Sequence, residues 1–133
     1  MGPRYLIDSN VLIDYTALRL PKKASDFVEA LFNTNFLISV VVKIEVLGFN
    51  DAPQKLLAME EFVNTAIVLP LEEPVTNQAI LLRRSYRRLK LGDAIIAATA
   101  LVYNLVLISR NTKDFENITG LELINPYQEN TSF

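Results

Sequence analysis

The sequence predicts an α/β protein, a three-layer α/β/α sandwich around a mostly parallel central sheet of about five strands. Short apolar runs of strand length alternate along the chain with segments of helical period, which is typical of βαβ units. The chain has 133 residues, of which 50% are hydrophobic, so it has the length and the core material of one domain. We therefore expect a single domain over residues 1–127 and a loose tail over residues 128–133.

The first strand is expected at residues 5–7, where a short apolar run is closed by the triplet Asp-Ser-Asn at 8–10. Those three residue types are typical of helix N-caps. A short amphipathic helix is expected to follow over residues 11–18. Pro21 then introduces a second helix over residues 24–32, because proline is favoured at the start of a helix.

The middle of the chain begins with an apolar run at residues 36–39, which predicts the second strand. Residues 41–47 fit either a strand or a helix, and we favour a change from strand to helix at Ser39. Residues 53–64 are helical by propensity and by period. Residues 66–71, closed by prolines, predict the third strand.

The last part of the chain contains one long amphipathic helix, one helix that is apolar on nearly every face, and two short strands. A stop signal and a new cap at Leu91-Gly92-Asp93 separate the two helices. In order, we expect a helix over 75–90, a helix over 94–103, a strand over 105–109, a polar connection over 112–117 and a strand over 121–124.

The residue types that are missing restrict the chemistry. The chain has no cysteine and no histidine, which excludes disulfides, thiolate nucleophiles, imidazole general bases and most zinc sites. The net charge of −2 gives no overall attraction to nucleic acid. No apolar stretch reaches the ~18 residues of a membrane-spanning helix, and Asp8 interrupts any signal peptide. We expect a soluble cytoplasmic protein without a membrane partner.

Several polar residues follow the predicted strands. They are Asp8 after the first strand, Glu45 about six residues after the second, Asp93 at the start of the apolar helix, and Ser109, Asn111 and Asp114 after the fourth strand. Parallel strands bring their carboxyl ends to one edge of a sheet, so these side chains are expected to converge. Converging carboxylates repel one another unless a cation neutralises them, and oxygen ligands suit Mg²⁺ or Mn²⁺. Such an ion can position a phosphodiester and activate water without any histidine.

Each acidic residue also has a purely structural interpretation. Asp8 and Asp93 each stand where a helix N-cap is expected, although a cap can still bind metal. Glu45 could belong to the solvent face of a helix, and Asp114 could be an ordinary turn residue. Their shared topological position favours a common site.

Five of the thirteen Lys and Arg residues lie in one short run. They are Arg83, Arg84, Arg87, Arg88 and Lys90. Their spacing is typical of a solvated helix face. Because the run immediately precedes Asp93, it is also expected beside the acidic edge, where its side chains could bind RNA phosphates.

Four motifs resemble those of a PIN domain. They are DSNVLID, the isolated Glu in VVKIEVLGF, LGDAIIAATAL, and ISRNTKDF followed by a strand and INPY. The size and the ending are most similar to the VapC-type toxins of bacterial toxin–antitoxin pairs, and the resemblance runs from residue 5 to about residue 127. It implies an α/β/α fold, an endoribonuclease that depends on Mg²⁺ or Mn²⁺, a homodimer and a cognate antitoxin.

The resemblance also implies roles for single residues. Asp8, Glu45 and Asp93 fall on the three most regular acidic positions of the family, which implies metal ligands. Asn111 stands where many members carry an acidic residue; its carbonyl can still orient water, but the lost charge argues against a second tightly bound metal. Supporting roles are implied for Ser9, Asn10, Ser109 and Asp114.

Three functions fit these observations, and we favour the first. It is a metal-dependent endoribonuclease with Asp8, Glu45, Asp93 and Asn111 at its centre. The second is a PIN-like binding module, inactive because the fourth carboxylate is missing. The third is an aspartyl phosphotransferase or receiver-like domain, which requires another carboxylate beside Asp8, where the chain has Ile7, Ser9 and Asn10.

Overall fold

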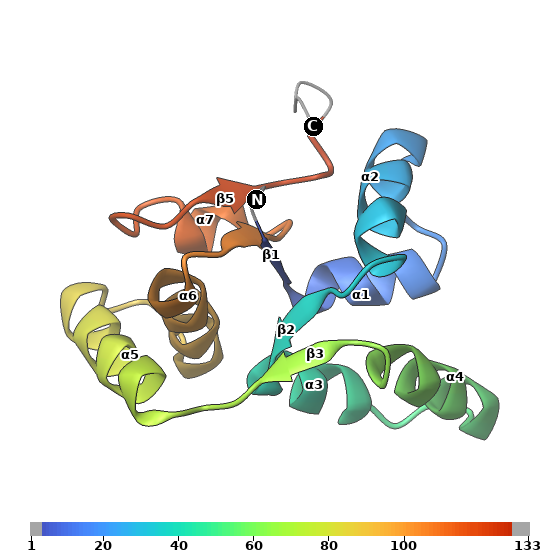
Figure 1. The fold of residues 1–133 in the computed structure, drawn as a ribbon, viewed down its shortest axis with the longest axis horizontal. Coiled ribbons are helices and arrows are strands. Elements are labelled where there is room, and N and C mark those ends of the chain that lie inside the picture. Colours follow the sequence, from blue (N-terminus) through green and yellow to red (C-terminus); the bar gives the residue numbers. More distant parts are fainter. Residues whose placement is uncertain (1–3, 129–133) are drawn as a thin grey trace.

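The computed structural model describes residues 4–128 of the chain. A sheet runs through the centre of the molecule, with α1 (Ser9–Thr16) and α2 (Lys22–Phe32) on one side and α5 (Glu73–Ser85) and α6 (Leu91–Tyr103) on the other (Figure 1). This arrangement confirms the predicted α/β/α sandwich. Most of the expected C-terminal tail lies outside the described residues.

The sheet has five strands, and every pairing in it is parallel. The strands are β1 (Tyr5–Ile7), β2 (Leu37–Ser39), β3 (Ile67–Leu69), β4 (Val106–Ile108) and β5 (Leu123–Ile124). Their order is β3-β2-β1-β4-β5, so β1 lies at the centre, between β2 and β4. All five predicted strands are present, and four of them are shorter than the apolar runs that predicted them.

Three further helices complete the fold: α3 (Val40–Leu47), α4 (Pro53–Val63) and α7 (Thr112–Phe115). The ambiguous stretch after Ser39 is helical, as favoured, because the Ser39 hydroxyl accepts a hydrogen bond from the Val41 backbone N–H at 3.1 Å and caps α3. The polar connection expected at residues 112–117 contains α7 as one short helical turn.

The prediction of one helix over residues 75–90 is wrong at its end, because α5 stops at Ser85. The guanidinium of Arg83 donates to the carbonyl of Leu89 at 2.8 Å, and the Leu89 side chain is buried. The hydrogen bond and the burial of Leu89 both require the chain to turn back toward α6 after Ser85. Arg87 and Arg88 therefore lie in a turn, and the basic run does not form one helix face.

Helix α6 begins at Leu91, earlier than predicted, so Asp93 lies within its first turn and does not cap it. A carboxylate is still favourable there, because the amino end of a helix carries a partial positive charge. Residues 94–100 are all buried, as the all-round apolar pattern predicts. Helix α6 ends at Asn104, which adopts the left-handed conformation at φ 55°.

The centre of the sheet supplies the rigid base of the molecule. Leu6, Ile7, Leu107 and Ile108, on the paired strands β1 and β4, are fully buried. Burial of each such side chain stabilises the fold by about 1.5–3 kcal/mol. The residues that directly follow β1 and β4 are therefore held by the best-packed strands of the sheet.

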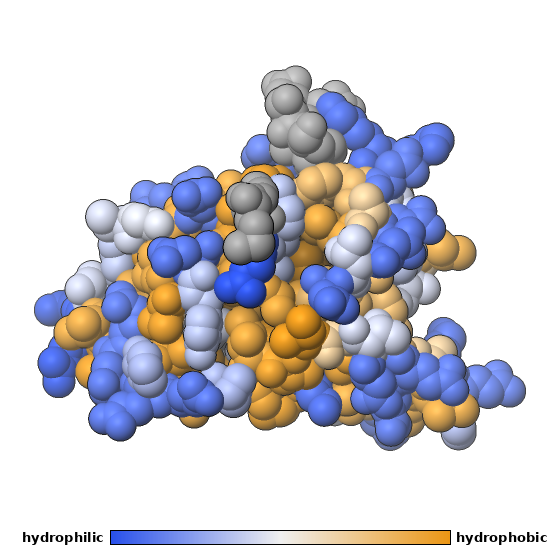
Figure 2. All heavy atoms as spheres, viewed as in Figure 1, coloured by the Kyte–Doolittle hydropathy of each residue, from blue (hydrophilic) through white to orange (hydrophobic). Residues whose placement is uncertain are grey.

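The surface is mixed in character. Viewed as in Figure 2, apolar residues gather over the middle of the molecule, and hydrophilic residues dominate the end that carries α5. Within residues 4–128, no helix is long and apolar enough to cross a bilayer.

Candidate functional site at the carboxyl ends of the strands

Asp8 directly follows β1 and is 5% exposed. One carboxylate oxygen, Oδ1, accepts from the backbone N–H of Ser9 at 2.8 Å. The other, Oδ2, accepts from the hydroxyl of Ser109 at 2.7 Å and from the side-chain amide of Asn10 at 3.3 Å. Burial raises the pKa of Asp8, and the negative charge of Glu45 adds to this, while these hydrogen bonds oppose it. Asp8 is thus both the cap of α1 and a strongly oriented carboxylate.

Ser109 directly follows β4 and is fully buried. Its hydroxyl oxygen accepts from the backbone N–H of Asn111 at 2.9 Å while it donates to Asp8. The carbonyl oxygen of the Asn10 side chain accepts from the backbone N–H of Arg110 at 3.1 Å. These bonds hold together the two loops that leave β1 and β4, as the strand-end argument predicts.

Glu45 lies on α3 and is exposed, but it does not belong to a purely solvated face. Its Oε1 accepts a hydrogen bond from the hydroxyl of Ser9 at 2.8 Å. This contact joins α3 to the start of α1. Glu45 therefore reaches the same edge of the sheet as Asp8.

Asp93 is partly buried and carries the clearest electrostatic sign of a shared site. Its pKa is raised to about 6, chiefly by burial and in addition by the negative charges of Asp8, Asp114 and Glu45. Asp114 in turn accepts from the side-chain amide of Asn111 at 2.6 Å. The structure therefore brings together the predicted acidic residues and Asn111.

We name these four carboxylates, Asp8, Glu45, Asp93 and Asp114, the acidic edge. None of them forms an ion pair with any residue between 4 and 128. They influence one another electrostatically, yet no three of the described carboxylates are gathered closely enough to hold an ion as they stand.

The basic run is divided between two surfaces. Arg83 and Arg84 line a pocket of about 490 Å³ with apolar residues of α5 and α6. Arg87 and Arg88 line another pocket, of about 410 Å³, together with Lys113. Lys90 is exposed just before α6. Lys113 is absent from the sequence-based prediction, because it lies far from the run along the chain.

A second buried aspartate, Asp14 on α1, also escaped the sequence analysis. It is 5% exposed, and it accepts from the Tyr127 hydroxyl at 2.6 Å and pairs with Arg110 at 2.8 Å. The Arg110 guanidinium also lies over the Tyr127 ring, 5.5 Å from its centroid. An aspartate inside the apolar segment VLIDYTAL was the available signal, but its partners lie almost a hundred residues away.

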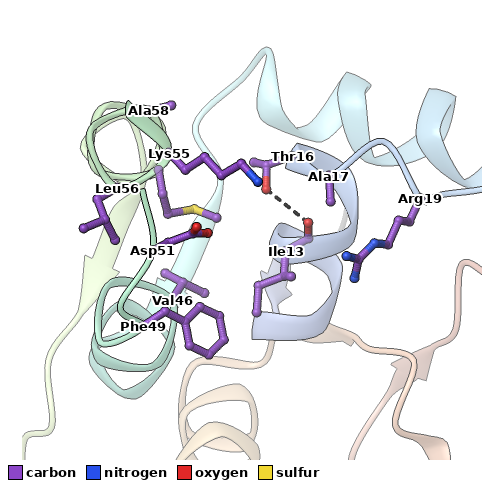
Figure 3. Close-up of a pocket in the computed structure, with 11 residues that line it drawn as sticks. Ile13, Thr16, Ala17, Arg19, Val46, Phe49, Asp51, Lys55, Leu56 and Ala58 are labelled. Atoms are coloured by element: carbon purple, nitrogen blue, oxygen red, sulfur yellow. Dashed lines mark hydrogen bonds between the residues drawn. The ribbon is translucent and has the colours of Figure 1, made fainter. Parts of the chain in front are cut away.

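An apolar pocket of about 310 Å³ lies among α1, α3 and α4. Figure 3 shows Ile13, Val46 and Phe49 along it, with Arg19 and Lys55 reaching in from its borders. No residue of the acidic edge lines this pocket. It is therefore separate from the candidate site.

Comparisons with known proteins agree with this geometry. The family model described as "PIN domain" matches residues 5–121. The chain belongs to the PIN domain family. The sequence resemblance is thereby confirmed over nearly its whole extent, and it includes the positions of Asp8, Glu45 and Asp93.

Two curated relatives show which PIN domain proteins are similar. "Ribonuclease VapC" of Rickettsia bellii is 27% identical over 125 residues, covering 90% of this chain and 93% of the relative. "Ribonuclease VapC1" of Haemophilus influenzae is 29% identical over 127 residues, covering 89% of this chain and 94% of the relative. Both alignments span nearly the full length of both partners.

Solved PIN domain structures are similar as well. A toxin–antitoxin complex from Klebsiella pneumoniae contains a chain with a TM-score of 0.77 and 30% identity, covering 93% of this chain and 98% of that one. VapBC-1 from nontypeable Haemophilus influenzae gives a TM-score of 0.75 and 27% identity, with the same coverage of both chains. The fold of this chain is thus shared with one chain in each of these two structures.

Proposed function

We propose that this PIN domain protein is a VapC-like endoribonuclease that depends on Mg²⁺ or Mn²⁺. The observation that carries the proposal is the acidic edge. Burial and the neighbouring carboxylates raise the pKa of Asp93, and none of the four carboxylates forms an ion pair with a described residue that would offset its charge. Repulsion among these carboxylates destabilises the folded protein unless a bound cation neutralises their charge. The relatives named Ribonuclease VapC support the same activity.

The donors at this edge fit a hard divalent cation, because all of them are oxygens of carboxylate, amide or hydroxyl groups. Asp8 and Asp93 would bind the ion directly, and Glu45 would bind it directly or through water. When bound, the ion would position the scissile phosphate, lower the pKa of a water molecule and offset the charge of the transition state.

The other residues of the site position these groups. Ser109, Asn10 and the Ser9 backbone N–H fix both oxygens of Asp8. The Ser9 hydroxyl holds Glu45, whose exposed carboxylate can take a proton from the attacking water. Asn111 holds Asp114, and its amide can orient water at the edge.

Cleavage of a mixed pool of structured RNAs by the purified protein tests this function. We expect cleavage with Mg²⁺ or Mn²⁺ and none with EDTA. Asp8→Asn and Asp93→Asn should each reduce the rate by at least about 100-fold, since even residues that only support metal ligands contribute 10–100-fold. The matched control is Glu61→Gln, an exposed residue on α4. Cleavage that survives in either aspartate variant would contradict the proposal.

Metal binding separates the enzyme from a PIN-like binding module without activity. At a concentration of 100 times its Kd, Mg²⁺ should stabilise the wild-type protein by about 2.7 kcal/mol in thermal denaturation. Asp93→Asn should remove this effect. If the wild type neither cleaves RNA nor gains stability from the metal, the inactive binding module is the better interpretation.

We also propose that the protein has a cognate antitoxin and forms a homodimer. The similar Klebsiella structure is named a toxin–antitoxin complex, and the similar Haemophilus structure is named VapBC-1. For the homodimer, Leu71, Ile80 and Leu91 are 46%, 44% and 62% exposed around one pocket, and a second copy would bury them. Analytical ultracentrifugation should show a dimer that Ile80→Glu converts to a monomer.

A further inference from the structure

The turn after α5 and the short helix α7 enclose a pocket of about 410 Å³. Its polar and aromatic lining consists of Tyr86, Arg87, Arg88, Lys113, Asp114 and Asn117, and we name it the Tyr86 pocket. The volume lies in the ~300–1,000 Å³ range of sites that hold a small ligand or one unit of a polymer. The pocket lies where the chain turns after α5 ends at Ser85. A helix that continued to residue 90, as predicted from the sequence, would lack this turn and therefore the pocket.

The charge of the Tyr86 pocket is positive, although the whole chain is acidic. Arg87, Arg88 and Lys113 are exposed, and none of them forms an ion pair with a residue of the described part of the chain. Asp114 is the one acidic residue of its lining. Cations without an ion-pair partner are suited to phosphate, which arginine can bind with two hydrogen bonds.

Tyr86 gives the pocket an aromatic wall that is fixed in place. Its hydroxyl accepts from the backbone N–H of Thr119 at 3.0 Å and lies 3.4 Å from the Thr119 side-chain oxygen. A fixed aromatic ring beside cations is the combination that binds single-stranded nucleic acid, with a base on the ring and phosphates on the cations. A free phosphate ion would make no use of the ring.

The Tyr86 pocket adjoins the acidic edge, because Asp114 belongs to both. Asp114 accepts from the side-chain amide of Asn111 at 2.6 Å, and its negative charge acts on Asp93. A nucleotide in the pocket would therefore lie next to the phosphodiester that the acidic edge holds.

We infer that the Tyr86 pocket binds one unstacked nucleotide of single-stranded RNA that neighbours the scissile bond. This inference rests on the proposed endoribonuclease function and adds to it the position of the substrate. It also divides the predicted basic run: Arg87 and Arg88, with Lys113, contact RNA in this pocket, whereas Arg83 is directed to the Leu89 carbonyl.

Binding of short randomised single-stranded RNA, followed by fluorescence anisotropy in EDTA, tests the inference without cleavage. The triple variant Arg87→Gln, Arg88→Gln, Lys113→Gln should raise the Kd about tenfold or more, and lost phosphate contacts should flatten its salt dependence by about 0.7 per contact. Tyr86→Leu should weaken binding at least about fivefold, whereas Tyr86→Phe, which keeps the ring, should bind nearly as the wild type does.

Lys22→Gln is the control, because Lys22 is an exposed cation on α2 that lies outside the pocket lining. It should change the Kd by less than about twofold. The inference is overturned if the triple variant binds as the wild type does, if Lys22→Gln weakens binding as much as the Lys113→Gln single variant, or if the wild type binds no RNA.

The two proposals fail separately. A wild type that binds RNA through the pocket but shows no metal-dependent cleavage would remove the proposed activity and support the pocket. Metal-dependent cleavage with an unchanged Kd in the triple variant would support the activity and overturn the pocket.

Discussion

Two aspartates are buried within residues 4–128, one immediately before α1 and one inside it, and their electrostatic surroundings are opposite. Asp8 and Asp14 are each 5% exposed. Asp14 faces the guanidinium of Arg110 and the hydroxyl of Tyr127. Asp8 faces only neutral donors and has other carboxylates of the acidic edge nearby. Equal burial therefore does not imply the same electrostatic environment, because a cation pairs with Asp14 and none pairs with Asp8 among the described residues.

The contrast extends to the groups around each aspartate. Burial and the hydrogen bond with Asp14 raise the pKa of Tyr127, so its hydroxyl stays a donor to the carboxylate. At the acidic edge the pKa of Asp93 is raised, because burial and then the like charges of its neighbours oppose its ionisation. The charge of Asp14 is balanced by Arg110, whereas the carboxylates of the acidic edge repel one another and have no ion-pair partner between residues 4 and 128.

The largest stability effect is expected around Asp14. Asp14→Ala leaves the partly exposed Arg110 and the Tyr127 hydroxyl without their acceptor, and it should lower the free energy of unfolding by about 2–3 kcal/mol. Asp8→Asn, measured by urea denaturation under the same conditions without metal, should destabilise less, because the lost hydrogen bonds to one carboxylate oxygen are offset by relief of like-charge repulsion. Equal destabilisation by both variants would remove the distinction between the two regions.

The next effect concerns pH at the acidic edge. The pKa of Asp93 is raised from 3.8 to about 6, so the folded protein binds a proton more tightly than the unfolded chain does. Its contribution to stability is greatest at low pH and is lost as the pH rises through about 6. Asp93→Asn should therefore stabilise the metal-free protein by about 1–2 kcal/mol at pH 8, after allowance for solvent screening.

Chemical denaturation across pH 4–8 checks this second prediction. The free energy of unfolding of Asp93→Asn should depend on pH less steeply than that of the wild type between about 4 and 6. Glu61→Gln, on α4, is again the control and should follow the wild type. A variant with unchanged pH dependence would mean that Asp93 does not feel the neighbouring carboxylates.

The smallest effect separates the contribution of Tyr127 from that of Arg110, whose polar atoms lie 2.6 Å and 2.8 Å from the Asp14 carboxylate. Tyr127→Phe removes one hydrogen bond to the carboxylate and keeps the ring beside Arg110, so it should lower the free energy of unfolding by about 1 kcal/mol. Thermal denaturation measures this loss. A larger effect than that of Asp14→Ala would show that the Tyr127 hydroxyl, and not the charge pair, holds this region.

Prediction from the sequence succeeded where the pattern is local. Apolar runs marked the strands, and the rule that parallel strands share a carboxyl edge placed Asp8 and Asn111 together. It failed at the end of α5, where local helix propensity continues but Arg83 and Tyr86 bond to groups further along the chain. Asp14 was missed for the same reason, since its partners Arg110 and Tyr127 are distant in sequence.

The strand order has a consequence for biosynthesis. β1 is synthesised before the other four strands, whereas its neighbour β4 and the serine that fixes Asp8 come late, because Ser109 lies 101 residues after Asp8. At translation rates of roughly 5–20 residues per second, the nascent chain waits about 5–20 s before both sides of the acidic edge exist. The proposed active centre is therefore incomplete until the last quarter of the chain has been synthesised.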